Sequence, residues 1–281
     1  MSIYDSLVSA SRFAASRWRA ARAGDGEEAQ LWRHVDEYRA FLGETGQVYL
    51  FEDYLKGVAP RQRPLVSTAL ETRQDAVASK RAMELLLKAF DETPEPEQKQ
   101  AASTLIHLLN FIADTGQLDD FEDFVNNRLE NAPLAIAHFT TRDEAQAWLK
   151  GLAKPPSPAR ILIGDEYYLA WSSREDNARD MYRDYIIEPY IGELVAGGIP
   201  STAPSFETRG EAEAWLKEHP ASPFGFVSIA GEYFFAVHHK RLKRHTLHPV
   251  ASALTKWEEM KRAAEREEAR DAVAKDEGDG E

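Results

Sequence analysis

Two segments of the N-terminal half match each other without a gap. FLGETGQVYLFEDYL at Phe41–Leu55 aligns with FIADTGQLDDFEDFV at Phe111–Val125, an offset of 70 residues. A match of this length indicates one supersecondary unit that occurs twice. Because such a unit cannot bury its apolar face alone, the two copies are expected to pack against each other. This duplication constrains the fold more than any other feature of the chain.

The sequence before each TGQ turn has the periodicity of an amphipathic helix. Apolar residues recur three or four positions apart in both copies, namely Leu31, Val35, Tyr38 and Phe41, and Leu105, Leu108, Leu109 and Ile112. A further helix is predicted before each pair, over Ile3–Arg22 and Arg73–Phe90. The glycines Gly46 and Gly116 are predicted to cap helix C-termini, where the backbone turns left-handed. Two three-helix units, about six helices in all, are therefore expected.

A second, different duplication occupies the C-terminal half. FTTRDEAQAWLK at Phe139–Lys150 returns as FETRGEAEAWLK at Phe206–Lys217, and both copies are followed by two short alternating strands. With a strand at Ala135–Phe139, the unit is β-α-β-β. Trp148 and Trp215 recur on the two helices at the spacing of a buried face, so we expect both in the core.

These patterns predict an α+β protein. A duplicated helical domain is expected over residues 1–132, and a duplicated β-α-β-β domain with a mainly antiparallel sheet over 133–250. A helical insertion is predicted near 176–195, ending at Gly197, Gly198 and Pro200, and its tyrosines form either core or a docking surface. Residues 251–281 have interleaved opposite charges, which predicts a charged helix and a flexible tail.

Composition excludes several classes of protein. The 281 residues contain no cysteine, which rules out disulfides, thiolate metal sites and a cysteine nucleophile, and favours the cytoplasm. No apolar run is long enough to span a membrane, and arginines interrupt the N-terminal stretch that a signal peptide would need. The net charge of −13 is shared by both halves. Duplex nucleic acid is therefore a poor partner, whereas a basic protein is a suitable one.

The segment HHKRLKRHTLHP, which begins at His238, is the sharpest chemical cluster in the sequence. We interpret it as a solvated strip or as a site for an anion or an acidic partner. The candidate binding residues are Lys240, Arg241, Lys243, Arg244, His245 and His248. If the segment were helical, His245 and His248 would share a face three residues apart, which leaves zinc as a third alternative.

The repeated acidic pairs suggest a second candidate site. Glu52 and Asp53 recur as Glu122 and Asp123, and two such pairs related by a pseudo-twofold axis could hold a metal. The Glu-x-x-His motif that metal sites in helical bundles normally use is missing from the sequence. Stabilisation of a helix N-terminus by nearby carboxylates is therefore the favoured interpretation.

No dinucleotide fingerprint, P-loop, nucleophile elbow or kinase signature is present, which favours binding over catalysis, and no cofactor is expected. The two motif pairs resemble those of lineage-restricted bacterial proteins of unassigned function. An acidic, cysteine-free chain with duplicated α+β units also resembles immunity proteins that neutralise toxins. The leading hypothesis is a cytoplasmic protein-binding module, an immunity or antagonist protein that neutralises a toxin or another basic partner. The alternatives are a self-associating scaffold and a metal-dependent enzyme centred on His238–His248.

Overall fold

The computed structural model describes residues 2–24, 26–59, 61–127, 133–199, 202–221 and 224–278, with side chains as far as 126 and 267 in the third and last ranges. Its contacts group the chain into two compact units. One comprises Met1–Asn131, Gln146–Ala159 and Ala170–Asp180, and the other Ala132–Ala145, Arg160–Leu169 and Met181–Glu281. The predicted boundary near residue 132, Pro200 and the last residues of the tail lie outside the described residues, and the three-part division stays a prediction.

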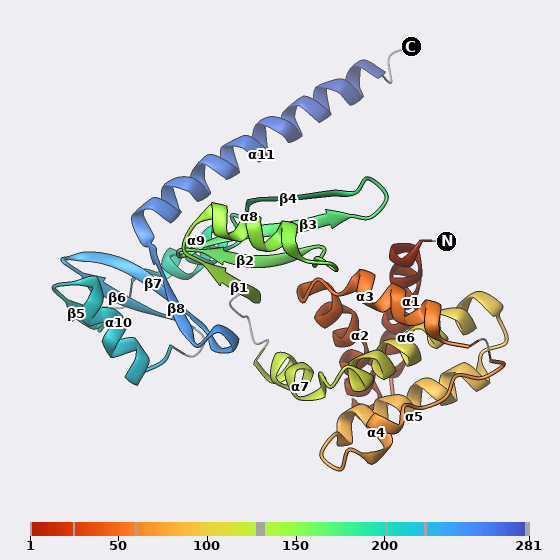
Figure 1. Ribbon diagram of the computed structural model, residues 1–281. Helices are drawn as coiled ribbons and strands as arrows, with labels where there is room; N and C mark the ends of the chain where they lie inside the picture. The colour runs from red at the N-terminus through yellow and green to blue at the C-terminus, as the bar shows by residue number, and fades with distance from the viewer. Residues whose placement is uncertain are drawn as a thin grey trace. The chain divides into compact units, whose positions relative to one another are not determined.

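The N-terminal part is helical, as predicted (Figure 1). Within the described residues its helices are α1 (Ile3–Ala21), α2 (Gly26–Glu44), α3 (Val48–Gly57), α4 (Thr68–Thr72), α5 (Val77–Glu92), α6 (Pro96–Asp114) and α7 (Leu118–Asn127). The two copies of the repeat are α1–α3 and α5–α7. The short helix α4 is an addition to the six that the periodicity predicts.

The two TGQ turns have the same geometry. Gly46 and Gly116 have φ values of +67° and +71°. In each turn the following glutamine N–H donates to a carbonyl five residues back, which closes a Schellman motif. The side chains of Gln47 and Gln117 exchange hydrogen bonds of 2.6 and 2.9 Å. A pseudo-twofold axis therefore passes between these two amides, as expected for a duplicated unit.

The helical core is continuous across both copies and lies entirely within residues 3–125. Its largest fully buried side chains include Trp32, Tyr38, Phe41, Phe51 and Phe121. Phe41 contacts Phe121 edge-to-face at 5.7 Å, and Phe51 contacts Phe111 at 5.6 Å. Aromatic residues of one copy thus pack against those of the other, which explains why both copies retain them.

The C-terminal part contains two four-stranded mixed sheets with the same order. The first comprises β1 (Ala135–Phe139), β2 (Ala159–Ile163), β3 (Glu166–Ser173) and β4 (Ala178–Arg183), and the second β5 (Ser205–Phe206), β6 (Phe224–Ile229), β7 (Glu232–His239) and β8 (Arg244–Pro249). The first pair in each sheet is parallel, and the second sheet continues with antiparallel pairs. Helices α8 (Arg142–Gly151) and α10 (Arg209–Glu218) follow the first strand of their sheets. The α+β fold class is confirmed.

The prediction of a helical insertion near 176–195 is partly wrong. Residues 178–183 form the strand β4, and only α9 (Ile187–Leu194) and the short turn η1 (Val195–Gly197) are helical. In β4, Met181 is buried between two exposed residues, which is the alternation of an edge strand. The fourth strand of the second sheet is β8, so β4 belongs to the repeat. The repeated unit is therefore β-α-β-β-β.

The second sheet has a separate apolar cluster on each face. One cluster lies against α10 and includes Ala212 and Leu216. The other joins β6 and β7 to residues of the first sheet, to α9 and to the final helix α11 (Val250–Gly278). Trp148 and Trp215 are only half-buried, because their neighbours Leu149 and Leu216 face the core instead. Trp215 still packs against the α10 cluster, so the prediction that both tryptophans are core residues is wrong only in expecting full burial.

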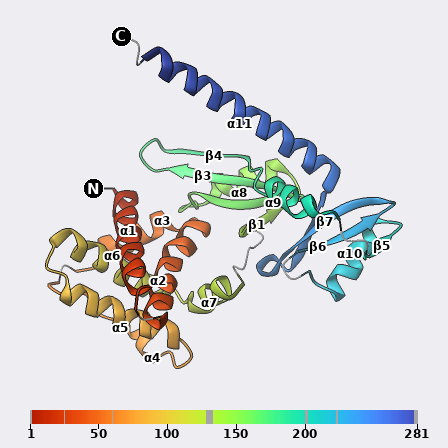
Figure 2. The ribbon, with the colours of Figure 1, turned by 180° about the vertical axis from the view of Figure 1, so that it is seen from behind.

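The final helix extends away from the sheets of its own unit (Figures 1 and 2). Val250 and Ala253 are buried, whereas every residue from 261 to 267 is exposed. Pairs such as Arg262 with Glu258 at 3.1 Å support the helix locally. Within the described part of the chain, none of the helices combines the length and apolar character needed to cross a membrane.

Candidate functional site

The predicted basic strip is not helical. Lys240–Leu242 form a 3-10 turn, η2, Lys243 has a left-handed backbone with φ 50°, and Arg244–Pro249 form β8. His245 and His248 therefore point to opposite faces of a sheet. The helical interpretation fails because β8 pairs with β7 over its whole length, a non-local contact that spacing along the chain cannot indicate.

One face of the β7–β8 pair carries His238 and His245. Their rings stack at 4.5 Å with an interplanar angle of 15°. His245 Nε2 accepts a hydrogen bond of 3.3 Å from the Ala221 N–H. Partial burial and, to a smaller extent, the neighbouring His238 lower the pKa of His245 to about 4. Both imidazoles are thus neutral at neutral pH and hold the chain that leads into β6.

The opposite face carries His239 and His248, which are 6% and 5% exposed. The Nε2 atoms of both rings lie 2.9 Å from the hydroxyl of Thr246, so the three side chains form one hydrogen-bonded chain. Tyr167 of the first sheet stacks on His248 at 6.0 Å. Burial lowers the pKa of each of these two histidines to about 3. They are neutral core residues at the contact between the two repeats.

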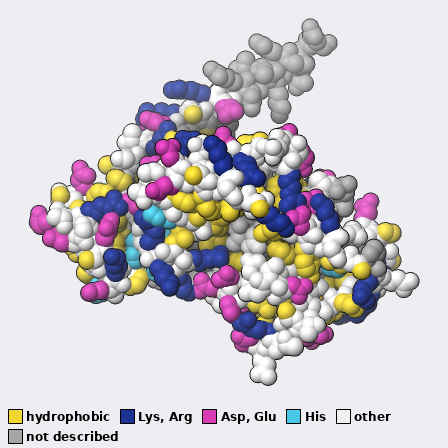
Figure 3. Space-filling view, in the orientation of Figure 1, with side chains coloured by type: hydrophobic (Ala, Val, Ile, Leu, Met, Phe, Trp, Pro, Cys, Tyr) yellow, Lys and Arg dark blue, Asp and Glu magenta, His cyan; other side chains and the backbone are white. Residues whose placement is uncertain are grey.

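The four cations of the strip have different surroundings. Arg244 is half-buried and pairs with Asp165 at 3.4 Å, and Arg209 pairs with the same carboxylate. Lys240, Arg241 and Lys243 are exposed. Figure 3 shows Lys and Arg side chains close to histidines over the second sheet. Binding of an anion or acidic partner by the strip stays a prediction, which concerns the three exposed cations. Across the described ranges, no three His, Cys, Asp or Glu residues are grouped for a metal ion.

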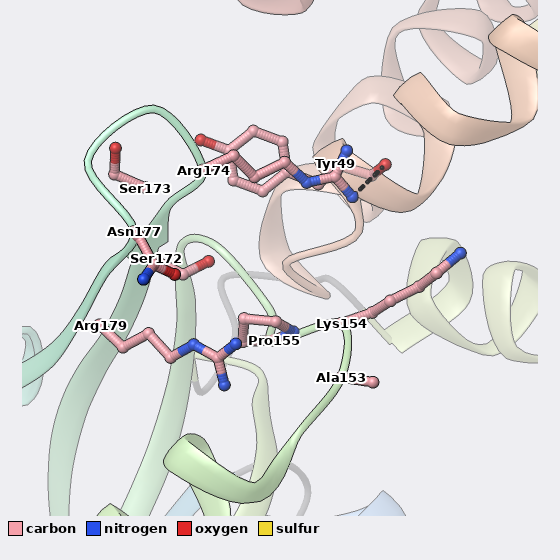
Figure 4. A pocket seen from close by; sticks show the side chains of 9 residues that line it. All are labelled: Tyr49, Ala153, Lys154, Pro155, Ser172, Ser173, Arg174, Asn177 and Arg179. Atoms are coloured by element: carbon pink, nitrogen blue, oxygen red, sulfur yellow. Dashed lines mark hydrogen bonds between the residues drawn. The ribbon is translucent and has the colours of Figure 1, made fainter.

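A cation clamp that the sequence did not indicate lies on α3. Arg174 donates to both oxygens of Asp53, at 2.7 and 3.0 Å, and to Glu52 at 3.0 Å. Its guanidinium also donates to the Tyr49 carbonyl at 3.1 Å and lies 4.5 Å from the centre of the Tyr49 ring (Figure 4). The acidic pair therefore binds a cation. The predicted role at a helix N-terminus is wrong, because α3 begins at Val48 and its first turn has no acidic residue.

The clamp has a strong electrostatic effect. The hydrogen bonds from Arg174, together with Lys154 at 3.1 Å, lower the pKa of Asp53 to about 2. Arg179 is held differently, by the carbonyls of Leu149, Lys150 and Leu152 at the C-terminal end of α8. Lys154, Arg174 and Arg179 border a hollow of about 160 Å³. It is lined by Tyr49, Ala153, Lys154, Pro155, Ser172, Ser173, Arg174, Asn177 and Arg179 (Figure 4).

The turn beside the clamp is also covered. The Ser157 N–H donates to the Gly46 carbonyl at 3.0 Å. A Cβ at Gly46 would lie 2.6 Å from Pro156 Cβ and 2.8 Å from Ala159 Cβ. We call Thr45, Gly46, Gln47, Glu52 and Asp53 the α3 face. Its contacts with the 156–159 segment, with Lys154 and with Arg174 come from chain more than 100 residues away.

In the second copy of the repeat, the residues that correspond to Thr45 and Gly46 are exposed, whereas those that correspond to Gln47, Glu52 and Asp53 are half-buried. We call Thr115, Gly116, Gln117, Glu122 and Asp123 the α7 face. Thr115 and Gly116 are exposed, and no atom of the described residues lies within 4 Å of a Cβ placed at Gly116. The repeat alignment identified the two faces as equivalent. It could not show that one of them is covered, because the covering segments belong to the other duplication.

Comparison with protein-family models, with curated proteins and with solved structures finds no match to this chain.

Proposed function

We propose that this chain is a cytoplasmic protein-binding module for a basic partner protein, in the manner of an immunity or antagonist protein. The observation that supports this best is the composition and exposure of α7. The helix carries Asp119, Asp120, Glu122 and Asp123 and has no lysine or arginine. Asp119 is 76% exposed and pairs with Arg73, which also pairs with Asp75.

The net charge of −13 favours the same class of partner. A field of one sign accelerates the approach of an oppositely charged protein and repels the phosphates of nucleic acid. Such association weakens with salt, because exposed charges are screened over about 8 Å at physiological ionic strength. A basic protein is thus a better partner for this surface than duplex nucleic acid.

The experiment begins with affinity purification of the full chain from its native cell at low ionic strength. Each co-purifying protein is then purified, and its binding to the chain is measured by calorimetry over a series of salt concentrations. We expect a direct complex with a basic protein, with an affinity that falls as salt increases. A direct partner that is acidic, or one whose affinity is independent of salt, would contradict the proposal.

Self-association through α11 is the second candidate function. The exposed residues from 261 to 267 favour it, because this part of the helix is accessible to another chain. Light scattering on the full chain and on a version ending at residue 260 separates the two candidates. A dimer that is lost on truncation supports the scaffold function, and a monomer in both cases supports the binding module.

A further inference from the structure

The hollow beside the cation clamp is lined by an unusual set of side chains. The lining includes Lys154, Arg174 and Arg179, and none of the nine described residues that form it is Asp or Glu. All nine belong to one compact unit, and Figure 4 shows them around the same space. Because the chain as a whole has a net charge of −13, this lining is a local exception. It suits a negatively charged ligand better than a cation.

Arg179 is the cation of this lining whose charge is not balanced by a carboxylate. Lys154 and Arg174 both pair with Asp53, at 3.1 and 2.7 Å. Arg179 is half-buried and donates from Nη1 alone, to three carbonyls at the C-terminal end of α8. Carbonyl oxygens carry no net charge, and Arg179 forms no ion pair with any of the residues that the structure describes. Since charges removed from water are normally paired, its Nε and Nη2 groups indicate a place for an anion.

Two uncharged donors line the same hollow. Ser172 is 6% exposed, and its hydroxyl lies 3.5 Å from the Pro156 carbonyl oxygen, which is too far for an effective O–H···O hydrogen bond. The Asn177 amide makes no hydrogen bond to another described residue. Asn177 has a left-handed backbone with φ 48°, in the turn between β3 and β4. A buried hydroxyl without a good acceptor is costly, and a ligand oxygen in the hollow would supply one.

We propose that this hollow binds a tetrahedral oxyanion such as phosphate, held mainly by Arg179, Ser172 and Asn177. A tetrahedral anion presents acceptors in several directions, whereas a carboxylate has two oxygens in one plane. At about 30 Å³ for each water, the hollow holds on the order of five water-sized groups, which is enough for one phosphate group. Exposed charges are screened over about 8 Å, so the groups that line the hollow decide its preference rather than the net charge. The inference goes beyond the proposed protein partner and does not depend on it.

The test is a titration of the isotope-labelled full chain with sodium phosphate, followed by NMR at constant pH. Sodium chloride of matched ionic strength is the control, and sodium acetate represents a planar carboxylate. With phosphate we expect saturable shift changes in the amides of Ala153, Lys154 and Ser172–Arg179, and with chloride none there. Acetate should bind about tenfold more weakly, because it leaves some of the donors without an acceptor. The same shift changes with chloride, or an equal affinity for acetate, would overturn the proposal.

Three variants remove the proposed donors one at a time. Ser172→Ala deletes a hydroxyl that has only a 3.5 Å contact with the protein, and Asn177→Gly keeps the left-handed backbone, so both should fold normally. Each should weaken phosphate binding about threefold, whereas Arg179→Gln should weaken it about tenfold or more, because the charged donor is the stronger. The matched control is Lys56→Gln, which removes an exposed cation that pairs with Glu52 and does not line the hollow. It should bind phosphate as the wild type does.

The variants also define what would contradict the site. An equal loss in Lys56→Gln and Arg179→Gln would mean that net charge governs binding, and it would overturn the proposal. If Arg179→Gln does not fold by circular dichroism, because α8 loses its C-terminal contact, the other two variants decide. Unchanged phosphate affinity in both Ser172→Ala and Asn177→Gly would then refute the site.

Discussion

At the scale of single residues, burial keeps both imidazoles in the chain of His239, Thr246 and His248 neutral. The Thr246 hydroxyl has one proton, so it donates to one ring and accepts from the N–H of the other. Arg183, Arg209 and Arg244 lie close enough to disfavour any added positive charge on these rings. Both histidines therefore stay unprotonated in the folded protein well below the pH at which free histidine is charged.

The stability of the protein should consequently decrease with acid. In the unfolded chain these histidines bind protons below about pH 6.5, whereas in the folded chain their pKa is about 3. Their contribution is complete above pH 6.5 and is lost as pH falls toward 3, by about 1.4 kcal/mol per pH unit for each histidine. Urea unfolding of the wild type and of His248→Gln at several pH values measures this slope. The free energy of unfolding should change less steeply with pH in His248→Gln than in the wild type. In the control His219→Gln, which replaces an exposed residue, the slope should equal that of the wild type. Equal slopes in all three proteins would show that the buried pair does not titrate as described.

At the scale of elements, the duplicated turns provide an internal control, because the same glycine occurs in two different environments. Gly46 and Gly116 share a left-handed backbone, which costs a residue with a Cβ about 1–2 kcal/mol. Only at Gly46 would the added atom also meet Pro156 and Ala159. The difference between the two positions therefore reports the tertiary contact alone.

Replacing each glycine by alanine should separate the two costs. Gly116→Ala is expected to lower the free energy of unfolding by about 1–2 kcal/mol. Gly46→Ala should lower it by about 1–3 kcal/mol more, because the 156–159 segment must move to admit the Cβ. Chemical denaturation of both variants measures the difference. Equal effects would mean that this segment does not cover the α3 face in solution.

The helices of the second duplication allow a similar comparison between adjacent residues. Leu216 is 2% exposed, whereas Trp215 is half-buried and lies between Phe206 and His219. Leu216→Ala should lower the free energy of unfolding by about 2–5 kcal/mol. Trp215→Ala should have the smaller effect although it removes more atoms, because its ring remains partly in water. Thermal denaturation with identical buffers ranks the two variants, and the reverse ranking would place the tryptophan in the core.

At the scale of the whole molecule, three apolar clusters account for the stability of the fold. The first contains only residues from 3 to 125, and the other two contain only residues from 135 to 254. Each half of the chain therefore has a core of its own, which is the usual requirement for independent folding. The contacts of Asp53 with Arg174 and of Gly46 with Ser157 connect the halves along the sequence without belonging to any of these cores.

Residues 1–132 and 133–281, expressed separately, should both fold. The helical fragment should show cooperative unfolding by circular dichroism with a lower midpoint than the full chain, because it lacks Arg174 and the 156–159 segment. The Arg174→Gln substitution in the full chain should lower its unfolding midpoint by part of that difference. Two unfolded fragments from a folded full chain would refute the division.

The sequence by itself determined the features that depend on local patterns. Duplication, helical periodicity and turn chemistry predicted the two repeats, the capping glycines Gly46 and Gly116, and the α+β class, because each is encoded within about twenty neighbouring residues. The equivalence of Glu52 and Asp53 with Glu122 and Asp123 followed from the same alignment. Only the tertiary structure decided that residues 178–183 form a strand, that His245 and His248 face opposite ways, and that Arg174 covers one acidic pair and not its twin. These features depend on which strand pairs with which and on which segment covers which surface. Such contacts join residues far apart in the chain, and no local pattern encodes them.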